Sequence, residues 1–136
     1  MSGAVLALRR AVQAHLAADA GLTALIGAGR LYEEPPRAAK GVYLVHGEVE
    51  ADDWSTGSDR GCEQRFGLVV WAGESASARQ ALEAAAAIVA SLSGAPLALD
   101  GHRLINLTWL SSRLARDARS QLPTVTLRFR AVTETL

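Results

Sequence analysis

The sequence predicts an α+β domain, in which an antiparallel sheet of about four main strands has two helices packed on one face. Two segments have apolar residues at three- and four-residue spacing, which is typical of amphipathic helices. Four longer segments are rich in β-branched and aromatic residues, which is typical of strands. Their order is helix, strand, strand, helix, strand, strand, which favours two antiparallel hairpins beneath a helical layer.

The composition limits this fold to a single domain over residues 1–136. Hydrophobic residues make up 49% of the chain, but 26 of them are alanine and only seven are aromatic. A buried Ala methyl contributes about 0.8 kcal/mol, against about 1.5–3 kcal/mol for a buried Leu or Phe. The core is therefore smaller than the percentage suggests, and we expect partner surfaces to add stability.

The first half of the chain begins with a helix and a proline-rich break. The helix has an apolar stripe at Val5, Leu8, Val12 and Leu16. We expect Gly21 to end this helix and Leu22–Ile26 to add one further turn. A short extended piece at Arg30–Tyr32 then precedes Pro35-Pro36, which is incompatible with a helix.

A strand pair and a second helix follow. The strands are expected at Val42–Val49 and Cys62–Ala72, joined by a polar loop at Glu50–Gly61 that is long for a hairpin. The helix begins after Ser75 or Ser77, because Ser77 and Gln80 have capping-box spacing. Its expected buried stripe is Ala78, Leu82, Ala85, Ile88 or Val89, and Leu92.

The last part of the chain contains two further strands, His102–Leu110 and Thr124–Thr135. Between them, Ser111–Leu122 is either a loop or an extended strand end.

No group of residues indicates catalysis, a metal or a cofactor. The three histidines lack metal-ligand spacing: His15, His46 and His102. The single cysteine, Cys62, excludes an internal disulfide, and a cysteine in a strand is more often a small buried hydrophobe than a reactive thiolate. The acids of Glu48–Asp59 favour a solvated loop over a metal or catalytic site. No apolar run approaches the roughly 18 residues of a membrane helix.

Charge is unevenly distributed along this neutral chain. Residues 33–63 have a formal charge of −5, whereas residues 103–130 have a formal charge of +5. Such poles suit head-to-tail association between copies, and the alternative is two ordinary solvated faces. We expect the loop Glu50–Gly61 to reach a neighbouring or axial subunit, with Trp54 as its apolar anchor. The candidate interface residues are Glu50, Asp52, Asp53, Trp54, Asp59, Arg60, Arg113, Arg116, Arg119, Arg128 and Arg130.

Short blocks along nearly the whole chain form a pattern in their order and spacing. They are Asp19-Ala20-Gly21-Leu22, Gly29-Arg30-Leu31-Tyr32, Pro35-Pro36, Phe66-Gly67-Leu68-Val69-Val70-Trp71 with the Ser- and Ala-rich helix after it, Leu99-Asp100-Gly101-His102-Arg103-Leu104, and Thr126–Glu134. Together they resemble the tail terminator (tail completion) proteins of long-tailed phages, prophages and gene transfer agents. The Arg- and Ala-rich composition is most similar to that of the alphaproteobacterial gene transfer agent members. The chain departs from the family at Val42, where proline is common.

The resemblance implies a structural protein and no enzyme. It implies a ring, usually of six copies, that caps the tail tube, stops tube polymerisation and joins the tail to the head connector (stopper) protein. The implied partners are further copies of the chain, the tail tube protein, the head connector and DNA in transit through the lumen, without a cofactor or a membrane. The implied location is the head–tail joint of a virion or gene transfer agent particle, assembled in the bacterial cytoplasm.

Three alternatives stay open at this point. One is a head-side stopper or adaptor ring of the same particle. Another is a small cytosolic enzyme that gathers His46, Cys62 or the loop acids in a pocket. The third is a DNA-binding module on the basic face of the last strand, which carries Arg128 and Arg130.

Overall fold

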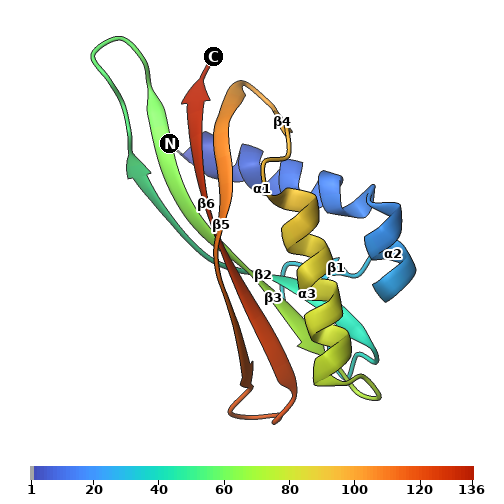
Figure 1. Cartoon of the computed structure of the whole chain (residues 1–136). Helices are drawn as coiled ribbons and strands as arrows, with labels where there is room; N and C mark the ends of the chain where they lie inside the picture. The colour runs from blue at the N-terminus through green and yellow to red at the C-terminus, as the bar shows by residue number, and fades with distance from the viewer. Residues whose placement is uncertain (1) are drawn as a thin grey trace.

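The computed structural model describes residues 2–136, which form three helices and one six-stranded sheet (Figure 1). The elements in chain order are α1 (Ser2–Ala17), α2 (Ala20–Ile26), β1 (Leu31–Tyr32), β2 (Val42–Asp53), β3 (Gly61–Ala72), α3 (Ala78–Leu92), β4 (Ala98–Leu99), β5 (His102–Arg116) and β6 (Pro123–Thr135). The strand order is β1-β2-β3-β6-β5-β4, and the helices lie on one side of the sheet. The expected α+β fold with a one-sided helical layer is confirmed.

The expectation of about four antiparallel strands is correct for the long strands only. β2, β3, β6 and β5 are antiparallel to one another in that order. A two-residue strand at each side brings the sheet to six strands, and β1 is parallel to β2, so the sheet is mixed. Two residues are too few to show the alternation that predicts a strand. In addition, α2 is a third helix where two were expected.

The first two helices separate at Asp19, and the expected end at Gly21 is wrong. The Asp19 carboxylate accepts a hydrogen bond from the Leu22 backbone N–H at 3.0 Å, which makes Asp19 the N-cap of α2. Because a cap satisfies a backbone donor at the start of a helix, the chain begins a new helix here and Gly21 lies inside it.

The third helix begins at the predicted cap, and its expected buried stripe is correct at Ala85, Ile88 and Leu92 but not in the first two turns. The Ser77 hydroxyl accepts from the Gln80 N–H at 3.2 Å, and the Gln80 side chain accepts from the Ser77 N–H at 2.9 Å. The buried residues are Ala81, Ala84, Ala85, Ile88 and Leu92. Leu82, expected in the buried stripe, is 44% exposed. In a segment so rich in Ala and Leu, the apolar spacing fits more than one face of the helix.

The core fills the space between the helices and the sheet. Phe66 and Phe129 stack there with ring centroids 5.4 Å apart, between α1 and the central strands. The β3 residues that alternate with Phe66 are also buried, among them Leu68 and Val70. Among the side chains of residues 3–136, no buried nitrogen or oxygen lacks a hydrogen-bond partner.

The expected loop at Glu50–Gly61 is too long, by four residues at its start and by one at its end. β2 continues to Asp53 and β3 begins at Gly61, so residues 54–60 form the connection. Figure 1 shows this hairpin extending past the helical layer. Its residues from Glu48 to Arg60 are exposed and mostly polar, and after Val49 only Ala51 continues the apolar alternation, which is too little to predict the strand end. Similarly, β5 runs to Arg116, which makes Ser111–Leu122 a strand end followed by a turn.

Candidate assembly surfaces

The sheet ends at both sides on a long strand that is only partly covered. β1 pairs with Leu44 and Val45 of β2, and β4 pairs with His102 and Arg103 of β5. Within residues 2–136, no strand pairs with the outer side of β2 over residues 46–53, here called the β2 edge. The same holds for β5 over residues 108–116, here called the β5 edge. Unpaired edges of this length are templates for a further strand.

The two edges differ in charge. The β2 edge carries four acids: Glu48, Glu50, Asp52 and Asp53. The β5 edge carries Arg113 and Arg116. A hydrogen bond of 2.6 Å from the Ser55 hydroxyl, together with the Ser55 N–H, lowers the pKa of Asp53 below its ordinary value. This carboxylate is therefore ionised at neutral pH, and the two edges carry opposite charge.

The hairpin is held to the sheet by residues from both predicted charge poles. The Arg130 guanidinium lies 5.4 Å from the Trp54 ring centroid and donates to a Glu63 carboxylate oxygen at 2.6 Å. The other Glu63 oxygen accepts from Arg65 at 3.2 Å. Arg130 therefore has a structural partner, which weakens the alternative that it meets DNA. Trp54 keeps 52% of its surface exposed beside this cluster.

The remaining hairpin candidates lie at its exposed connection. The Asp59 backbone N–H donates to the Thr56 hydroxyl at 3.2 Å, and the Thr56 N–H donates to the Asp59 carbonyl at 2.9 Å. The Arg60 carbonyl accepts from Thr135 at 2.9 Å, which ties this turn to the end of β6. Residues 50–60, which include six of the candidates, thus lie on one exposed arm.

The other basic candidates lie apart from this arm. Arg116 donates to the Gln121 carbonyl at 2.9 Å across the β5–β6 turn, which also contains Arg119. Arg128 lies in the middle of β6 and is half-buried. Arg113 is exposed, and within the described range it makes neither an ion pair nor a side-chain hydrogen bond. The eleven candidates therefore belong to separate surfaces and form no single site.

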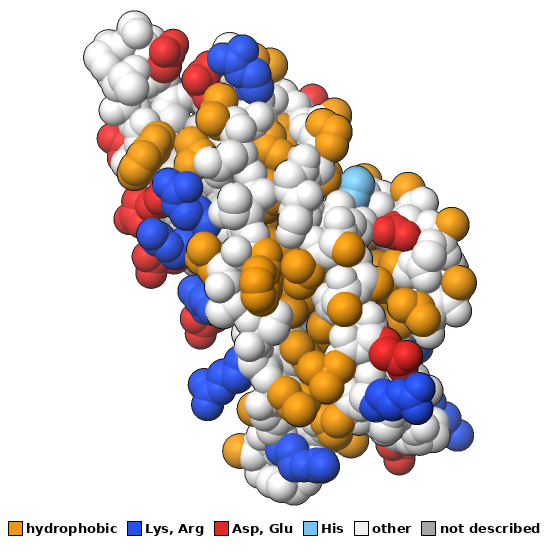
Figure 2. All heavy atoms as spheres, in the orientation of Figure 1, with side chains coloured by type: hydrophobic (Ala, Val, Ile, Leu, Met, Phe, Trp, Pro, Cys, Tyr) orange, Lys and Arg blue, Asp and Glu red, His pale blue; other side chains and the backbone are white. Residues whose placement is uncertain are grey.

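Sequence reasoning missed an apolar groove between α3 and β5. The groove has a volume of about 430 Å³, and its lining includes Leu82 and Val89 of α3 and Trp109 of β5. Trp109 is 46% exposed and Leu114 is 49% exposed. Figure 2 shows apolar side chains gathered along this face, over α3 and β5. The available signal was Trp109, a large aromatic residue in the predicted strand, and Leu82, which the apolar spacing of the helix places in the buried stripe.

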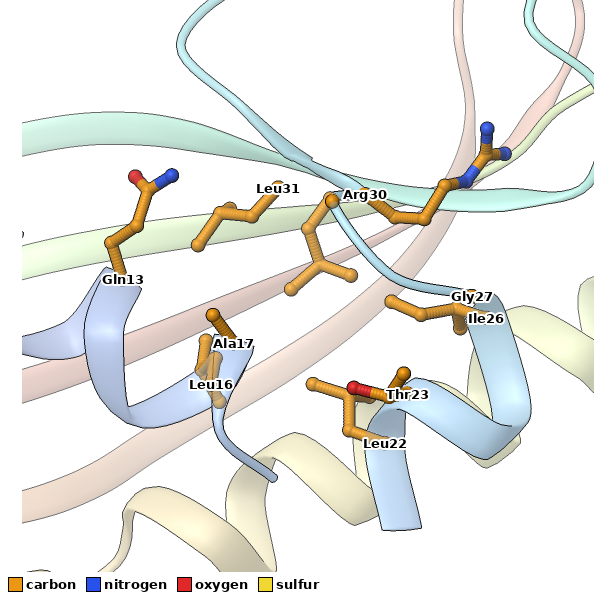
Figure 3. Close-up of a pocket in the computed structure, with 11 residues that line it drawn as sticks. Gln13, Leu16, Ala17, Leu22, Thr23, Ile26, Gly27, Arg30 and Leu31 are labelled. Atoms are coloured by element: carbon orange, nitrogen blue, oxygen red, sulfur yellow. The ribbon is translucent and has the colours of Figure 1, made fainter. Parts of the chain in front are cut away.

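A smaller cavity between α1, α2 and residues 27–31 offers no chemistry (Figure 3). Its volume is about 60 Å³, and its lining is largely apolar, with Leu16, Leu22 and Ile26 among its walls. Figure 3 shows the Arg30 guanidinium pointing away from these residues, and this group donates to the Val42 carbonyl at 3.2 Å.

The histidines and the cysteine have separate, structural surroundings. His15 contacts Ser91 at 3.0 Å and His102 contacts the Asp100 carbonyl at 2.8 Å. His46 contacts Gln13 at 3.0 Å, and burial, with help from Arg9, lowers its pKa. Burial raises the pKa of the Cys62 thiol. Among residues 2–136 there is no cluster of three or more His, Cys, Asp or Glu that could hold a metal ion.

None of the helices in the described range is both long and apolar enough to cross a membrane.

Comparisons with known proteins agree with this architecture. The family model "Tail completion protein gp17" matches residues 10–134. The chain is also similar to a chain in a solved structure described as "Virion of native gene transfer agent (GTA) particle". The identity is 34%, the TM-score is 0.85, and the match covers 96% of each chain. No curated protein sequence matches the chain.

Proposed function

Because the chain belongs to the tail completion protein gp17 family and is a structural tail component of a phage-like particle rather than an enzyme, we propose that it forms a ring that caps the tail tube. In this proposal the ring contains six copies. One face binds the last layer of tail tube protein and stops polymerisation. The other face binds the head connector, and DNA passes through the lumen.

The observation that carries the ring is the pair of unlike edges on one sheet. The acidic β2 edge and the basic β5 edge lie at opposite sides of the same sheet. When the β2 edge of one copy meets the β5 edge of another, the pair still has one free β2 edge and one free β5 edge. Further copies can therefore add until the rotation between neighbours closes a ring. Opposite charges favour this unlike pairing over contact between two acidic or two basic edges.

The hairpin arm is the proposed contact with the next layer of the particle. It extends past the helices and presents Trp54, whose ring is held in place on one side by Arg130. An aromatic side chain that is already ordered loses little conformational freedom on binding. We therefore assign tube or connector binding to the arm and ring closure to the two edges.

The position and stoichiometry of the protein in the particle test the proposal. Particles that lack the protein should carry tubes of uncontrolled length without heads, and the wild-type gene should restore joined tails of one length. Averaged electron micrographs should show six copies around the axis at the tube end. A single copy, or a position away from the axis, would disprove the ring. A ring at the portal would instead assign the chain to a stopper or adaptor.

The arm has its own test in Trp54→Ser. We expect this variant to fold and to join at least tenfold fewer tails, because only an exposed contact side chain is lost. Leu25→Ser, which removes an equally exposed apolar residue from α2, outside the arm and both edges, is the comparison for stability. If Trp54→Ser particles assemble as efficiently as wild type, the arm is not a contact.

A further inference from the structure

The β5 edge exposes large apolar side chains where an uncovered strand normally carries charge. Trp109, Leu110 and Leu114 are each close to half-exposed. Bulges next to residues 105 and 110 bend the strand, which limits indiscriminate pairing. An apolar edge of this length is nevertheless an association surface, because no strand of the described chain pairs with its outer backbone groups and its large apolar side chains are about half-exposed.

The groove beside α3 extends this surface into the helical layer. Leu82 and Val89 form one wall, and small alanines between them keep the groove open towards Trp109. The floor includes Val125 of β6, the residue paired with Leu114. A partner that paired with the β5 edge would therefore also have to supply apolar side chains on the helix side of the sheet.

The β2 edge of a second copy meets this requirement. The registers place Val49 opposite Phe66, Phe66 opposite Phe129, and Phe129 opposite Trp109. Cross-strand partners share a face, so an apolar row crosses the sheet on its helix side and is exposed at both ends. If a second copy stands beside the first with its apolar row in line, Val49 of the second copy lies next to Trp109 of the first.

Strand direction also fits. β2 is antiparallel to β3, β3 to β6 and β6 to β5, so β2 and β5 of one chain run in opposite directions. Rotation about an axis along the strands preserves direction, so the β2 edge of the next copy is antiparallel to the β5 edge it meets. With the apolar rows in line, Glu50 lies beside Thr108, and Glu48 lies beside residues 110 and 111, two positions from Arg113, whereas Arg116 lies level with Val42. The apolar row and the strand direction, more than the charges, therefore identify the partner edge.

We propose that the β5 edge and the groove beside it receive the β2 edge of a second copy as an added antiparallel strand. Val49 and Leu6, an exposed residue of α1, then pack against Trp109 and the outer side of α3. The inference rests on the proposed ring and adds the identity of the contact surfaces and the direction of the strands. In the closed ring, the sheets of neighbouring copies form one continuous sheet.

Paired cysteines in assembled particles test the surfaces and the direction. In a Cys62→Ala background, each chain carries one cysteine on the β2 edge, at position 48, 50 or 52, and one on the β5 edge, at position 108, 111 or 113. Mild oxidation should link successive copies into a covalent ladder on a non-reducing gel. Because the strands are antiparallel, a later β5 position should link best to an earlier β2 position. Single-cysteine chains and the pair Glu50→Cys with Arg79→Cys, which lies on α3 away from the groove, should give no ladder.

A second variant keeps the inference testable if cysteine chains assemble poorly. Trp109→Ser should still be folded at the assembly temperature but enter particles at least tenfold less, whereas Leu25→Ser, which removes an equally exposed residue from α2, should enter normally. Two results overturn this inference while the ring itself stands. One is a ring seen by microscopy without a ladder from any cysteine pair. The other is a ladder in which later β5 positions link best to later β2 positions. Absence of a ring at the tube end overturns the proposed function itself.

Discussion

Replacing Arg130 by methionine removes the ion pair that joins β6 to β3 beneath the hairpin. Arg130 Nε lies 2.6 Å from a Glu63 oxygen, and the two side chains are 24% and 10% exposed. Methionine retains an unbranched apolar stem, so most of the effect comes from loss of the guanidinium. Glu63 then keeps only Arg65, at 3.2 Å, whose side chain is 39% exposed.

The expected loss of stability lies between two limits. Removing one partner of a fully buried ion pair costs about 3–5 kcal/mol, whereas an exposed pair contributes about 0–1 kcal/mol. The Glu63 carboxylate is mostly buried but retains a second arginine, so we expect a loss of about 2 kcal/mol. The contact of Arg130 with the exposed Trp54 ring adds about 0.5 kcal/mol. Arg65→Met removes the more exposed partner and should cost about 0.5–1 kcal/mol.

Urea unfolding of the wild type, Arg130→Met, Arg65→Met, Glu63→Gln and the Arg130/Glu63 double variant measures these differences. The double variant isolates the coupling between the two side chains. Two protein concentrations are needed, because self-association would raise the apparent stability. The reasoning is refuted if Arg130→Met lies within 0.5 kcal/mol of wild type, or if Arg65→Met costs more than Arg130→Met.

Three further outcomes follow from the local geometry. Ser77→Ala removes the N-cap of α3 and should lower the free energy of unfolding by about 1 kcal/mol in urea titration. Ile88→Ala empties a fully buried site and should cost about 3–4 kcal/mol, whereas Leu82→Ala on the half-exposed side should cost about 1 kcal/mol. Burial and Arg9 lower the folded-state pKa of His46 below 6.5, so the unfolded chain takes up this proton more readily. Stability should therefore be constant above pH 6.5 and decrease as the pH falls from there through the folded-state pKa, and His46→Gln should flatten this decrease in unfolding curves.

The long elements could be predicted because their signals are local. The capping box at Ser77 and Gln80 lies within one turn of helix, and the alternation in β6 lies within one strand. The ends of β2 and β5 could not be predicted in this way. Glu50–Asp53 is polar and exposed, and it is a strand because it pairs with residues 62–65 of β3. Long-range pairing, not intrinsic preference, sets that boundary.

The candidate surfaces could be predicted only in part, for a related reason. Uneven charge along the chain is visible in the sequence, and the acidic and basic candidates lie on the arm, on β5, on β6 and in the β5–β6 turn. The pair of Arg130 and Glu63 joins residues 67 positions apart, and no local pattern indicates it. The groove depends on which way α3 is turned, and the Ala-rich sequence of α3 does not determine that.

The alanine-rich composition explains why so much apolar surface is left for partners. Ala81 and Ala84 are fully buried, so small side chains fill the contact between α3 and the sheet. The larger Leu82, Trp109 and Leu114 are left outside, each close to half-exposed. Complete burial of such a side chain contributes about 1.5–3 kcal/mol, so roughly half of that is still available at each position. Packing the fold on alanine therefore reduces the stability of the single chain. It also leaves large apolar side chains exposed on one face, and a repeated contact between copies can gain stability by burying them.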